Sequence, residues 1–227
     1  MTDPSIDMTR TEDVFVLQMV ADENRFNPAM LDAFDRALGE IEQSDGAAAV
    51  VITGQGKFFS NGLDLEWMMA NAEQGGPARV ANGLQALYRR LVTFPVATVA
   101  AMNGHAFAGG AMLALACDQR VMRSGRGFFC LPEVDINIPF TPGMSKLVQA
   151  KLTPSVAYEA MLTGRRFSAE EAHAAGFVDA VGSEDEVLPM AVERAQALAG
   201  KTRTTVATIK ERMYDDVAAA LAETADW

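Results

Sequence analysis

Cysteine and histidine are scarce in this 227-residue sequence, which contains two of each. Both cysteines, Cys117 and Cys130, lie in apolar segments, which argues against a disulfide framework and favours a reducing compartment. Neither His105 nor His173 makes a metal site, so the sequence predicts no bound metal.

Long hydrophobic runs are missing too. No apolar stretch approaches the roughly 18 residues that a membrane span needs. The first ten residues, Met1–Arg10, are polar and include two aspartates, which is unlike a targeting segment. We therefore expect a cytoplasmic protein with no membrane partner.

Basic residues are in the minority, with 19 Lys and Arg against 30 Asp and Glu and a formal net charge of −11. A charge of this sign opposes general attraction to nucleic acid or to an anionic membrane. A local basic pocket for a phosphate group stays compatible with it. Since 49% of the residues are hydrophobic, the chain can bury one sizeable core, and we expect small-molecule or protein partners.

Strands and helices alternate along the first half of the chain. Apolar, β-branched runs predict buried strands, and amphipathic segments between them predict helices. The expected strands are Val14–Val20, Ala47–Thr53, Val96–Met102 and Gln119–Met122, and the expected helices are Pro28–Gln43 and Ala78–Leu91. This order predicts an α/β protein with a parallel sheet.

From Pro142 onward strands nearly vanish from the pattern. The remaining segments predict helices at Pro142–Lys151, Pro154–Leu162, Ser168–Ala175, Glu184–Ala199 and Thr204–Ala222. We therefore divide the chain into an α/β core, residues 1–140, and a helical C-terminal region, residues 141–227. The pattern contains no internal repeat and no flexible linker.

Two glycine-rich loops follow neighbouring predicted strands. The loop Gly54–Leu65 follows the second strand and the turn Asn103–Gly110 follows the third, so both lie at the carboxyl edge where open α/β sheets bind ligands. Backbone N–H groups near Leu63 and Gly109 can converge there on one carbonyl oxygen and stabilise an oxyanion. For either loop alone, a tight turn without chemistry is an equally good interpretation.

A carboxylate in apolar company is the third candidate feature. Glu133 follows Leu131-Pro132 and precedes Val134, which predicts a partly desolvated carboxyl group with a raised pKa and a stronger basicity. Such a group is a candidate proton carrier. The alternative is that Glu133 caps a turn or forms an ordinary salt bridge.

Together these segments resemble the enoyl-CoA hydratase/isomerase (crotonase) family in order and spacing. The segments that carry the resemblance are Lys57–Leu65, Asn103–Gly110, Cys117-Asp118, Leu131-Pro132-Glu133, Met161–Gly164, Ser168–Ala172 and Ala175–Val178. The resemblance implies a crotonase-like spiral of ββα units, and a helical C-terminal region that forms a homotrimer or a dimer of trimers. It also implies an acyl-CoA thioester substrate, in which coenzyme A is part of the substrate and no separate cofactor is needed.

The resemblance assigns roles to individual residues. It implies an oxyanion hole made by the N–H groups of Leu63 and Gly109, and an adenine contact with backbone near Ser60 and Asn61. The expected substrate-binding set is completed by Gly62, Met68, Met112 and Phe140. Of these, Phe140 lies in Ile138–Met144, which is bulkier than the segment usual in the family and predicts a reshaped acyl pocket.

One departure from the family pattern sharpens the expected reaction. Family hydratases use two glutamates to position and deprotonate water, and the matching positions here are Met112 and Glu133. Methionine cannot activate water, whereas a single glutamate suffices to move one proton. This resembles the Δ3,Δ2-enoyl-CoA isomerases, which convert 3-enoyl-CoA to 2-enoyl-CoA through an enolate.

Two alternatives stay open at this point. An enoyl-CoA hydratase or an acyl-CoA hydrolase is possible if Asp135 or His105 replaces the missing acid, and a non-catalytic CoA-binding scaffold is the alternative outside enzymes. Asp64 is expected to cap a helix, and His105 to hydrogen-bond to backbone. The candidates for contacts with CoA phosphates, each with solvated surface charge as the alternative, are Lys57, Arg89, Arg90 and Lys210.

Overall fold

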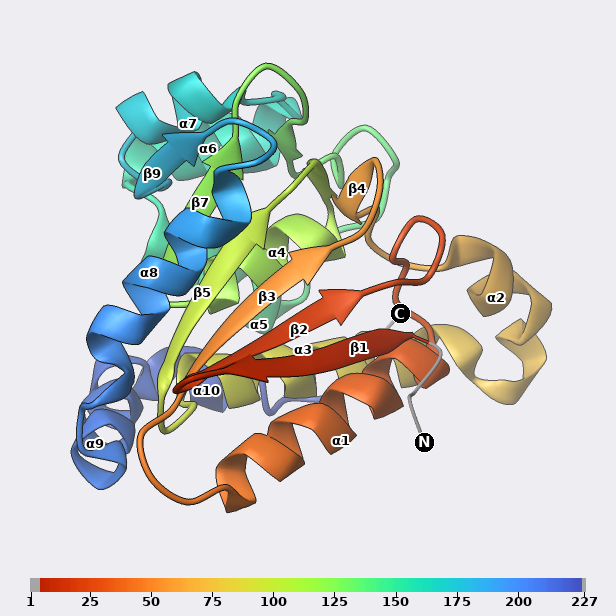
Figure 1. Cartoon of the computed structure of the whole chain (residues 1–227). Coiled ribbons are helices and arrows are strands. Elements are labelled where there is room, and N and C mark those ends of the chain that lie inside the picture. Colours follow the sequence, from red (N-terminus) through yellow and green to blue (C-terminus); the bar gives the residue numbers. More distant parts are fainter. Residues whose placement is uncertain (1–4, 226–227) are drawn as a thin grey trace.

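Two sheets organise the computed structural model, which describes residues 5–225 (Figure 1). The large sheet has the strand order β1-β2-β3-β5-β7-β9, and the small sheet has the order β4-β6-β8. Only β1 is antiparallel to its neighbour; the other pairings in both sheets are parallel. The fold is therefore the α/β class with a parallel-dominated sheet that the sequence predicts.

The strands and helices have the following bounds. The strands are β1 (Ile6–Thr11), β2 (Val14–Met19), β3 (Ala49–Gly54), β4 (Phe58–Ser60), β5 (Ala97–Met102), β6 (His105–Phe107), β7 (Gln119–Arg123), β8 (Phe129–Cys130) and β9 (Ala180–Gly182). The helices are α1 (Pro28–Gln43), α2 (Leu65–Ala70), α3 (Gly76–Val92), α4 (Gly109–Ala116), α5 (Pro142–Lys151), α6 (Pro154–Thr163), α7 (Ala169–Ala174), α8 (Val187–Ala199), α9 (Arg203–Met213) and α10 (Asp215–Ala220), with a 3₁₀ turn at Ala72–Gln74.

A repeating connection links the two sheets. The strands β3, β5 and β7 belong to the large sheet, and the strand that follows each of them, β4, β6 or β8, belongs to the small sheet before the chain continues into helix. This is the spiral of ββα units that the resemblance implies. It carries the loops after β3 and β5 to the same edge of the large sheet.

Both faces of the large sheet are covered. The helix α8 crosses one face, where Val51, Val99 and Ala191 belong to a smaller apolar cluster, while α1, α3 and α4 cover the other face and enclose the main core (Figure 1). Because α8 comes from the helical C-terminal region, residues beyond 141 complete the core of the preceding region.

Several elements differ from the sequence-based expectation. The edge strand β1 was not expected because its exposed residues are mostly polar, yet it pairs along its whole length with β2. The expected helix Thr204–Ala222 is two helices, α9 and α10. They are separated at Tyr214, which leaves helical geometry (φ −123°, ψ 25°) and accepts a 2.9 Å hydrogen bond from Lys151 Nζ. The short strand β9 was also missed.

No helix within residues 5–225 is long and apolar enough to cross a membrane.

Candidate active site

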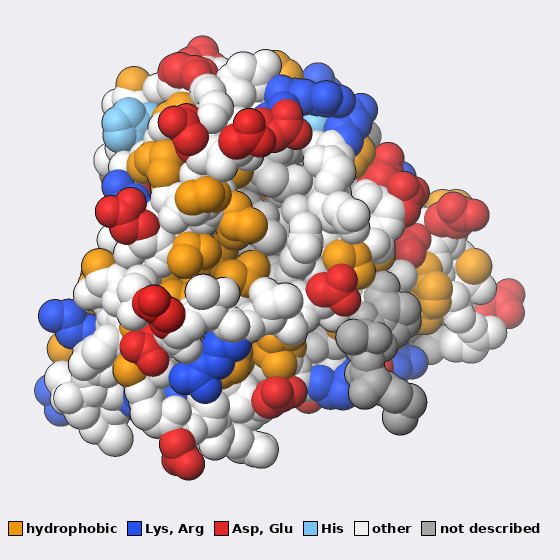
Figure 2. Space-filling view, in the orientation of Figure 1, with side chains coloured by type: hydrophobic (Ala, Val, Ile, Leu, Met, Phe, Trp, Pro, Cys, Tyr) orange, Lys and Arg blue, Asp and Glu red, His pale blue; other side chains and the backbone are white. Residues whose placement is uncertain are grey.

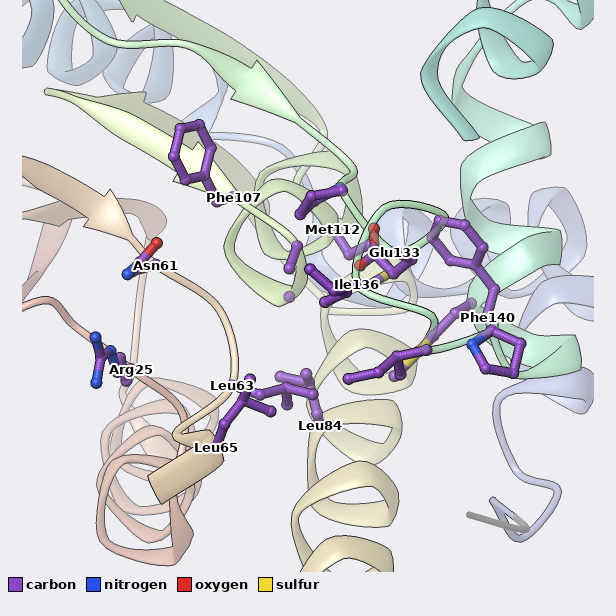
Figure 3. Close-up of a pocket in the computed structure, with 16 residues that line it drawn as sticks. Arg25, Asn61, Leu63, Leu65, Leu84, Phe107, Met112, Glu133, Ile136 and Phe140 are labelled. Atoms are coloured by element: carbon purple, nitrogen blue, oxygen red, sulfur yellow. The ribbon is translucent and has the colours of Figure 1, made fainter. Parts of the chain in front are cut away.

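An apolar cavity of about 280 Å³ opens at the edge where β3 and β5 end (Figure 3). It is lined from four directions: by Leu63 of the first glycine loop, by the start of α4, by the 132–140 segment that carries Glu133, and by Leu84 of α3. The sequence-predicted catalytic residues Glu133, Leu63 and Gly109 therefore line one cavity.

Glu133 is held in the cavity by a tight turn. The N–H groups of Asp135 and Ile136 both donate to Pro132 O (2.9 and 3.1 Å), and Ile138 N–H donates to Glu133 O (3.1 Å). The side chain is 6% exposed, and its Oε2 is buried without a hydrogen-bond partner. Burial raises the pKa of this carboxyl group from 4.5 to about 7, because the charged form loses its hydration.

The loop that contains Leu63 pairs with Phe26 as a short parallel bridge, and the N–H of Leu63 points away from Phe26. Phe26 N–H donates to Gly62 O (2.7 Å), and Asp64 N–H donates to Phe26 O (2.9 Å). In an extended chain, the polar groups of the residue between these two bonds point the opposite way. Among the described residues the Leu63 N–H has no protein acceptor, and Leu63 lines the cavity.

The N–H of Gly109 is freed by a strained turn. Gly109 is the first residue of α4, whose N–H groups lack partners within the helix. The preceding residue, Ala108, has φ 48° and ψ −121°, a conformation that costs a non-glycine residue about 1–3 kcal/mol. The Ala108 N–H donates to Cys130 O (3.0 Å). This geometry leaves two unpaired backbone donors, on Leu63 and Gly109, at one cavity.

The rest of the lining is divided into an apolar and a more polar end. Met112 of α4 lines the wall with Glu133, and Phe140 lies at the apolar end (Figure 3); Met144 also lines the cavity. At the other end lie Arg25 and Asn61; Arg25 was not expected from the sequence. It forms an ion pair with Glu23, and Asn61 Nδ2 also donates to Glu23 (2.8 Å).

Three expected substrate-binding residues do not line the cavity within the described structure. Ser60 is fully buried, and its hydroxyl donates to Asn24 O (2.7 Å) and accepts from Gly62 N–H (3.2 Å). Met68 of α2 is buried in the main core. Gly62 has φ +82° and lies against the Ala108–Gly109 turn. Ser60 and Gly62 shape the glycine loop, Met68 packs in the core, and none of the three forms part of the cavity wall.

The other polar candidates lie outside the cavity lining. Asp64 caps α2 as expected, accepting from Trp67 N–H (2.9 Å). Asp135 lies against Gly164 after α6, because the segment after Glu133 is a turn and not an extended strand. His105 was expected to bond to backbone, but its Nδ1 is buried without a partner and its ring lies among Phe58, Phe107 and Phe128.

Two of the four cations proposed for CoA phosphates are already paired. Arg90 binds Asp35 and Glu42 (both 2.8 Å), and Lys210 is buried in an ion pair with Asp118 (2.5 Å). Their distant partners were not evident from the sequence.

Lys57, a third of these four cations, lies with Arg126 and Arg166 around His105. Burial and the nearby charges of Lys57, Arg166 and Arg126 lower the pKa of this histidine. The Arg166 guanidinium lies 5.5 Å from the ring centre of Phe107, which lines the cavity. Figure 2 shows basic side chains gathered at the upper edge of the molecule, near the loop that follows β7. We call Lys57, Arg126 and Arg166 the basic cluster.

Cys117 and Cys130 are free and buried, and burial raises the pKa of their thiols to about 12 and about 11. No group of three or more His, Cys, Asp or Glu side chains within residues 5–225 is arranged to hold a metal ion. The cavity thus presents one buried carboxylate and two backbone donors. This is the type of site that moves a proton next to a carbonyl group while backbone stabilises the resulting oxyanion.

Comparison with known proteins identifies the family. The model of the enoyl-CoA hydratase/isomerase family matches residues 9–226. Enoyl-CoA delta isomerase 3 of Arabidopsis thaliana is 35% identical over 215 residues, which cover 90% of each chain. A putative enoyl-CoA hydratase of Thermus thermophilus is 35% identical over 191 residues, covering 83% of this chain and 74% of the relative. The chain belongs to the enoyl-CoA hydratase/isomerase family.

Solved structures agree with this assignment. An apo structure of a Mycobacterium tuberculosis enoyl-CoA isomerase superposes with a TM-score of 0.89 at 31% identity, covering 97% of this chain and 95% of the other. A second structure of the same mycobacterial protein, described there as a probable enoyl-CoA hydratase, has a TM-score of 0.89 at 30% identity, covering 96% of this chain and 91% of the other. The crotonase-type fold and an enzymatic role of enoyl-CoA isomerase or hydratase type are therefore established.

Proposed function

We propose that this enzyme isomerises 3-enoyl-CoA to 2-enoyl-CoA, with Glu133 as the only proton carrier. The observation that carries the proposal is the cavity wall itself, where Glu133 is accompanied by Met112 and by two unpaired backbone N–H groups. A methionine offers no group that activates water, so the site is suited to moving a proton and not to adding water.

The chemical steps balance with one base. The Glu133 carboxylate removes a proton from C2 of the 3-enoyl thioester, and the electron pair of the broken C–H bond delocalises into an enolate. The N–H groups of Leu63 and Gly109 donate to the enolate oxygen; a donor of this kind contributes about 3 kcal/mol. Protonated Glu133 then returns the proton to C4, which moves the double bond from C3–C4 to C2–C3 and regenerates the carboxylate.

The raised pKa of Glu133 suits this role. A carboxylate with an ordinary pKa is a weak base toward a thioester α-proton, whereas burial raises the pKa of Glu133 to about 7. Near neutral pH this group is both partly deprotonated and more basic. The absence of a hydrogen-bond partner on its Oε2 leaves one oxygen free to accept the proton.

The two ends of the cavity support one orientation of the substrate. We place the CoA moiety toward Arg25 and Asn61, and the acyl chain toward Phe140, because the first end is polar and the second apolar. The basic cluster lies beyond Phe107, outside the cavity lining. It offers positive charge to the phosphates of CoA in a chain whose net charge is −11.

The hydratase and hydrolase alternatives lack support from the cavity. Asp135 and His105 were the residues considered as a second acid, and neither lines the described cavity with Glu133. A non-catalytic scaffold would give no role to the buried Glu133 carboxylate, whose Oε2 has no hydrogen-bond partner.

Assembly and location are separate proposals. We propose a homotrimer or a dimer of trimers formed through the region 141–227, whose helices expose apolar side chains such as Tyr158, Leu162 and Ile209. Sedimentation velocity tests this assembly. The cytoplasmic location stays a prediction, since some relatives are described as peroxisomal.

A product assay tests the reaction. The purified protein is incubated separately with a 3-enoyl-CoA and with the matching 2-enoyl-CoA, and the products are identified by mass and by absorbance of the conjugated thioester. A conjugated product of unchanged mass supports the isomerase. A gain of one water overturns it in favour of a hydratase, release of free CoA overturns it in favour of a hydrolase, and no change with either substrate favours a scaffold.

A further inference from the structure

Tyr88 of α3 makes a hydrogen bond that the proposed chemistry does not use. Its side chain is completely buried, and its hydroxyl donates to the backbone oxygen of Gly109 at 2.6 Å. Gly109 is the residue whose N–H we assign to the enolate. The bond therefore joins α3 to Gly109, the first residue of α4, whose N–H is a proposed donor to the enolate oxygen.

The turn that Tyr88 contacts departs from ordinary backbone geometry. The residue before α4, Ala108, has positive φ, and α4 has no side-chain cap at its N-terminus. A strained backbone of this kind persists only when its surroundings hold it in place. Two backbone hydrogen bonds outside the regular helix pattern also hold this turn, from Ala108 N–H to Cys130 O and from Met112 N–H to Ala108 O. Tyr88 is thus the side chain that holds the Gly109 carbonyl.

Packing around Gly109 reinforces the connection. A Cβ atom built on Gly109 would lie 2.9 Å from Leu84 Cδ2 and 3.2 Å from the Tyr88 hydroxyl, so α3 approaches the start of α4 closely. Leu84 and Tyr88 lie one helical turn apart, and Leu84 lines the cavity. In addition, burial and the charge of Glu133 raise the pKa of Tyr88, so the phenol lies within electrostatic reach of the carboxylate.

We propose that Tyr88 is a positioning residue of the oxyanion hole: its hydroxyl, bonded to Gly109 O, fixes the strained Ala108–Gly109 turn so that the Gly109 N–H faces the substrate oxygen. This proposal rests on the proposed function. Tyr88 touches no reacting atom, and it acts through the backbone of the turn.

The test compares two variants that each lose one phenolic hydroxyl. Tyr88→Phe removes the bond to Gly109, whereas the control Tyr214→Phe removes the bond to Lys151, at a tyrosine that does not line the cavity. Each variant loses the contribution of about one hydrogen bond to the free energy of unfolding, so the melting temperatures of the two variants should fall to a similar extent. Two readouts are used: turnover of a 3-enoyl-CoA, and the near-ultraviolet absorbance of bound acetoacetyl-CoA, whose enolate form reports stabilisation of the oxyanion without turnover.

For Tyr88→Phe we expect kcat to fall by about 10- to 100-fold, because small misplacements of catalytic groups have effects of this size. KM should change little, and the ratio of enolate to keto form of bound acetoacetyl-CoA should fall with kcat. Tyr214→Phe should retain both readouts. If Tyr88→Phe fails to fold, Tyr88→Met offers a second donor-free side chain of flexible shape and should show the same losses.

Unchanged kcat and enolate ratio in the folded Tyr88 variant, together with a melting temperature like that of Tyr214→Phe, would make Tyr88 a purely structural residue and overturn the proposal. If the wild-type protein forms the enolate but does not convert 3-enoyl-CoA, the proposed function fails while the enolate ratio still tests Tyr88. A wild-type protein that binds acetoacetyl-CoA without forming any enolate overturns the positioning role as well.

Discussion

Gly62 and Gly109 approach each other so closely that a Cβ atom built on Gly62 would lie 3.2 Å from the Gly109 nitrogen. The same atom would lie 2.9 Å from Ala108 Cβ and 3.0 Å from Phe107 O. Gly62 also has φ +82°, a conformation that favours glycine. The contact brings the backbone of Leu63 beside that of Gly109. The two proposed donors can lie close together because Gly62 has no side chain.

The first prediction follows from this contact. Gly62→Ala should separate the two loops and lower kcat/KM for a 3-enoyl-CoA by about 10²-fold, the effect expected when one oxyanion donor is lost. Gly46→Ala is the matched control, because Gly46 has the same φ of +82° but no atom within 4 Å of its built Cβ. Both variants carry the same backbone strain, and only the first collides with the turn. Equal activity of the two variants would contradict the prediction.

The residues that the sequence predicts to be catalytic line one cavity, whereas some of those predicted to bind substrate do not. Glu133, Leu63 and Gly109 were found because glycine loops at strand ends and a carboxylate in apolar company are local patterns. Ser60 was assigned to the substrate through a backbone contact with adenine that the resemblance implies, and Met68 as part of the expected substrate-binding set. In the structure both are buried, with Ser60 bonded to Asn24 O and Met68 in the main core. Local sequence does not distinguish a side chain that shapes a loop from one that lines the cavity beside it.

Contacts between distant segments account for most of what the sequence missed. Arg90 is neutralised by residues of α1, and Tyr88 meets Gly109 only because α3 packs on the start of α4. The environment of Gly109 is likewise set by a distant segment, because a Cβ atom built there would lie 2.9 Å from Leu84 Cδ2 of α3, while its φ is not positive. Substitutions at Gly109 therefore disturb packing and are a poorer test than Gly62→Ala.

The second prediction concerns the proton carrier. Glu133→Gln should lower kcat by about 100-fold or more while acyl-CoA still binds, because the amide keeps the shape but cannot accept the proton. Asp135→Asn is the control, since that carboxylate lies two residues away and outside the cavity lining. Steady-state kinetics and a binding titration with a saturated acyl-CoA separate the two effects. Near-wild-type isomerisation by Glu133→Gln would remove Glu133 from the mechanism.

The third prediction is that the titration of Glu133 changes kcat/KM and the free energy of unfolding in opposite directions as pH rises. Because burial raises the pKa of Glu133 to about 7, kcat/KM should rise as pH increases through 7 and the carboxylate forms. The stability changes in the other direction. Between pH 4.5 and 7 the unfolded chain releases this proton while the folded protein keeps it, so the free energy of unfolding falls by up to about 3 kcal/mol.

Glu133→Gln isolates this contribution to stability, since the glutamine does not titrate. Relative to the wild-type protein, the variant should gain up to about 3 kcal/mol between pH 4.5 and pH 8 in denaturant titrations. Taking the difference between two proteins at each pH cancels all other titrating groups. A constant difference across this range would mean that the carboxyl group has an ordinary pKa in the folded protein.

The fourth prediction concerns the apolar end of the cavity. Phe140→Ala should let the cavity accept longer acyl chains, because the Phe140 ring forms part of the cavity wall. A buried methylene contributes about 0.8 kcal/mol, so each additional accommodated methylene should raise kcat/KM about fourfold relative to the wild-type preference. Phe128→Ala removes a phenylalanine that does not line this cavity and is the control. An unchanged chain-length profile in Phe140→Ala would place the acyl chain elsewhere.

The fifth prediction concerns the phosphates of CoA and the basic cluster. If these cations attract the phosphates, replacing Arg126 and Arg166 together by glutamine should lower kcat/KM for a 3-enoyl-CoA by about 10-fold, since exposed charge pairs contribute up to about 1 kcal/mol each. The loss should shrink at high salt. The same acyl group on pantetheine, which lacks all phosphates, should react equally well with both proteins.

The pantetheine thioester separates phosphate recognition from any change at the carbonyl. Arg90→Gln provides the matched control, because it also removes a positive charge, but one that Asp35 and Glu42 already neutralise. A charge lost anywhere on the protein would affect both variants, whereas a phosphate contact affects only the Arg126/Arg166 double variant and only the CoA substrate. A loss of equal size with the pantetheine thioester would show that the cluster acts on the cavity itself, through Phe107 beneath Arg166, and not on the phosphates.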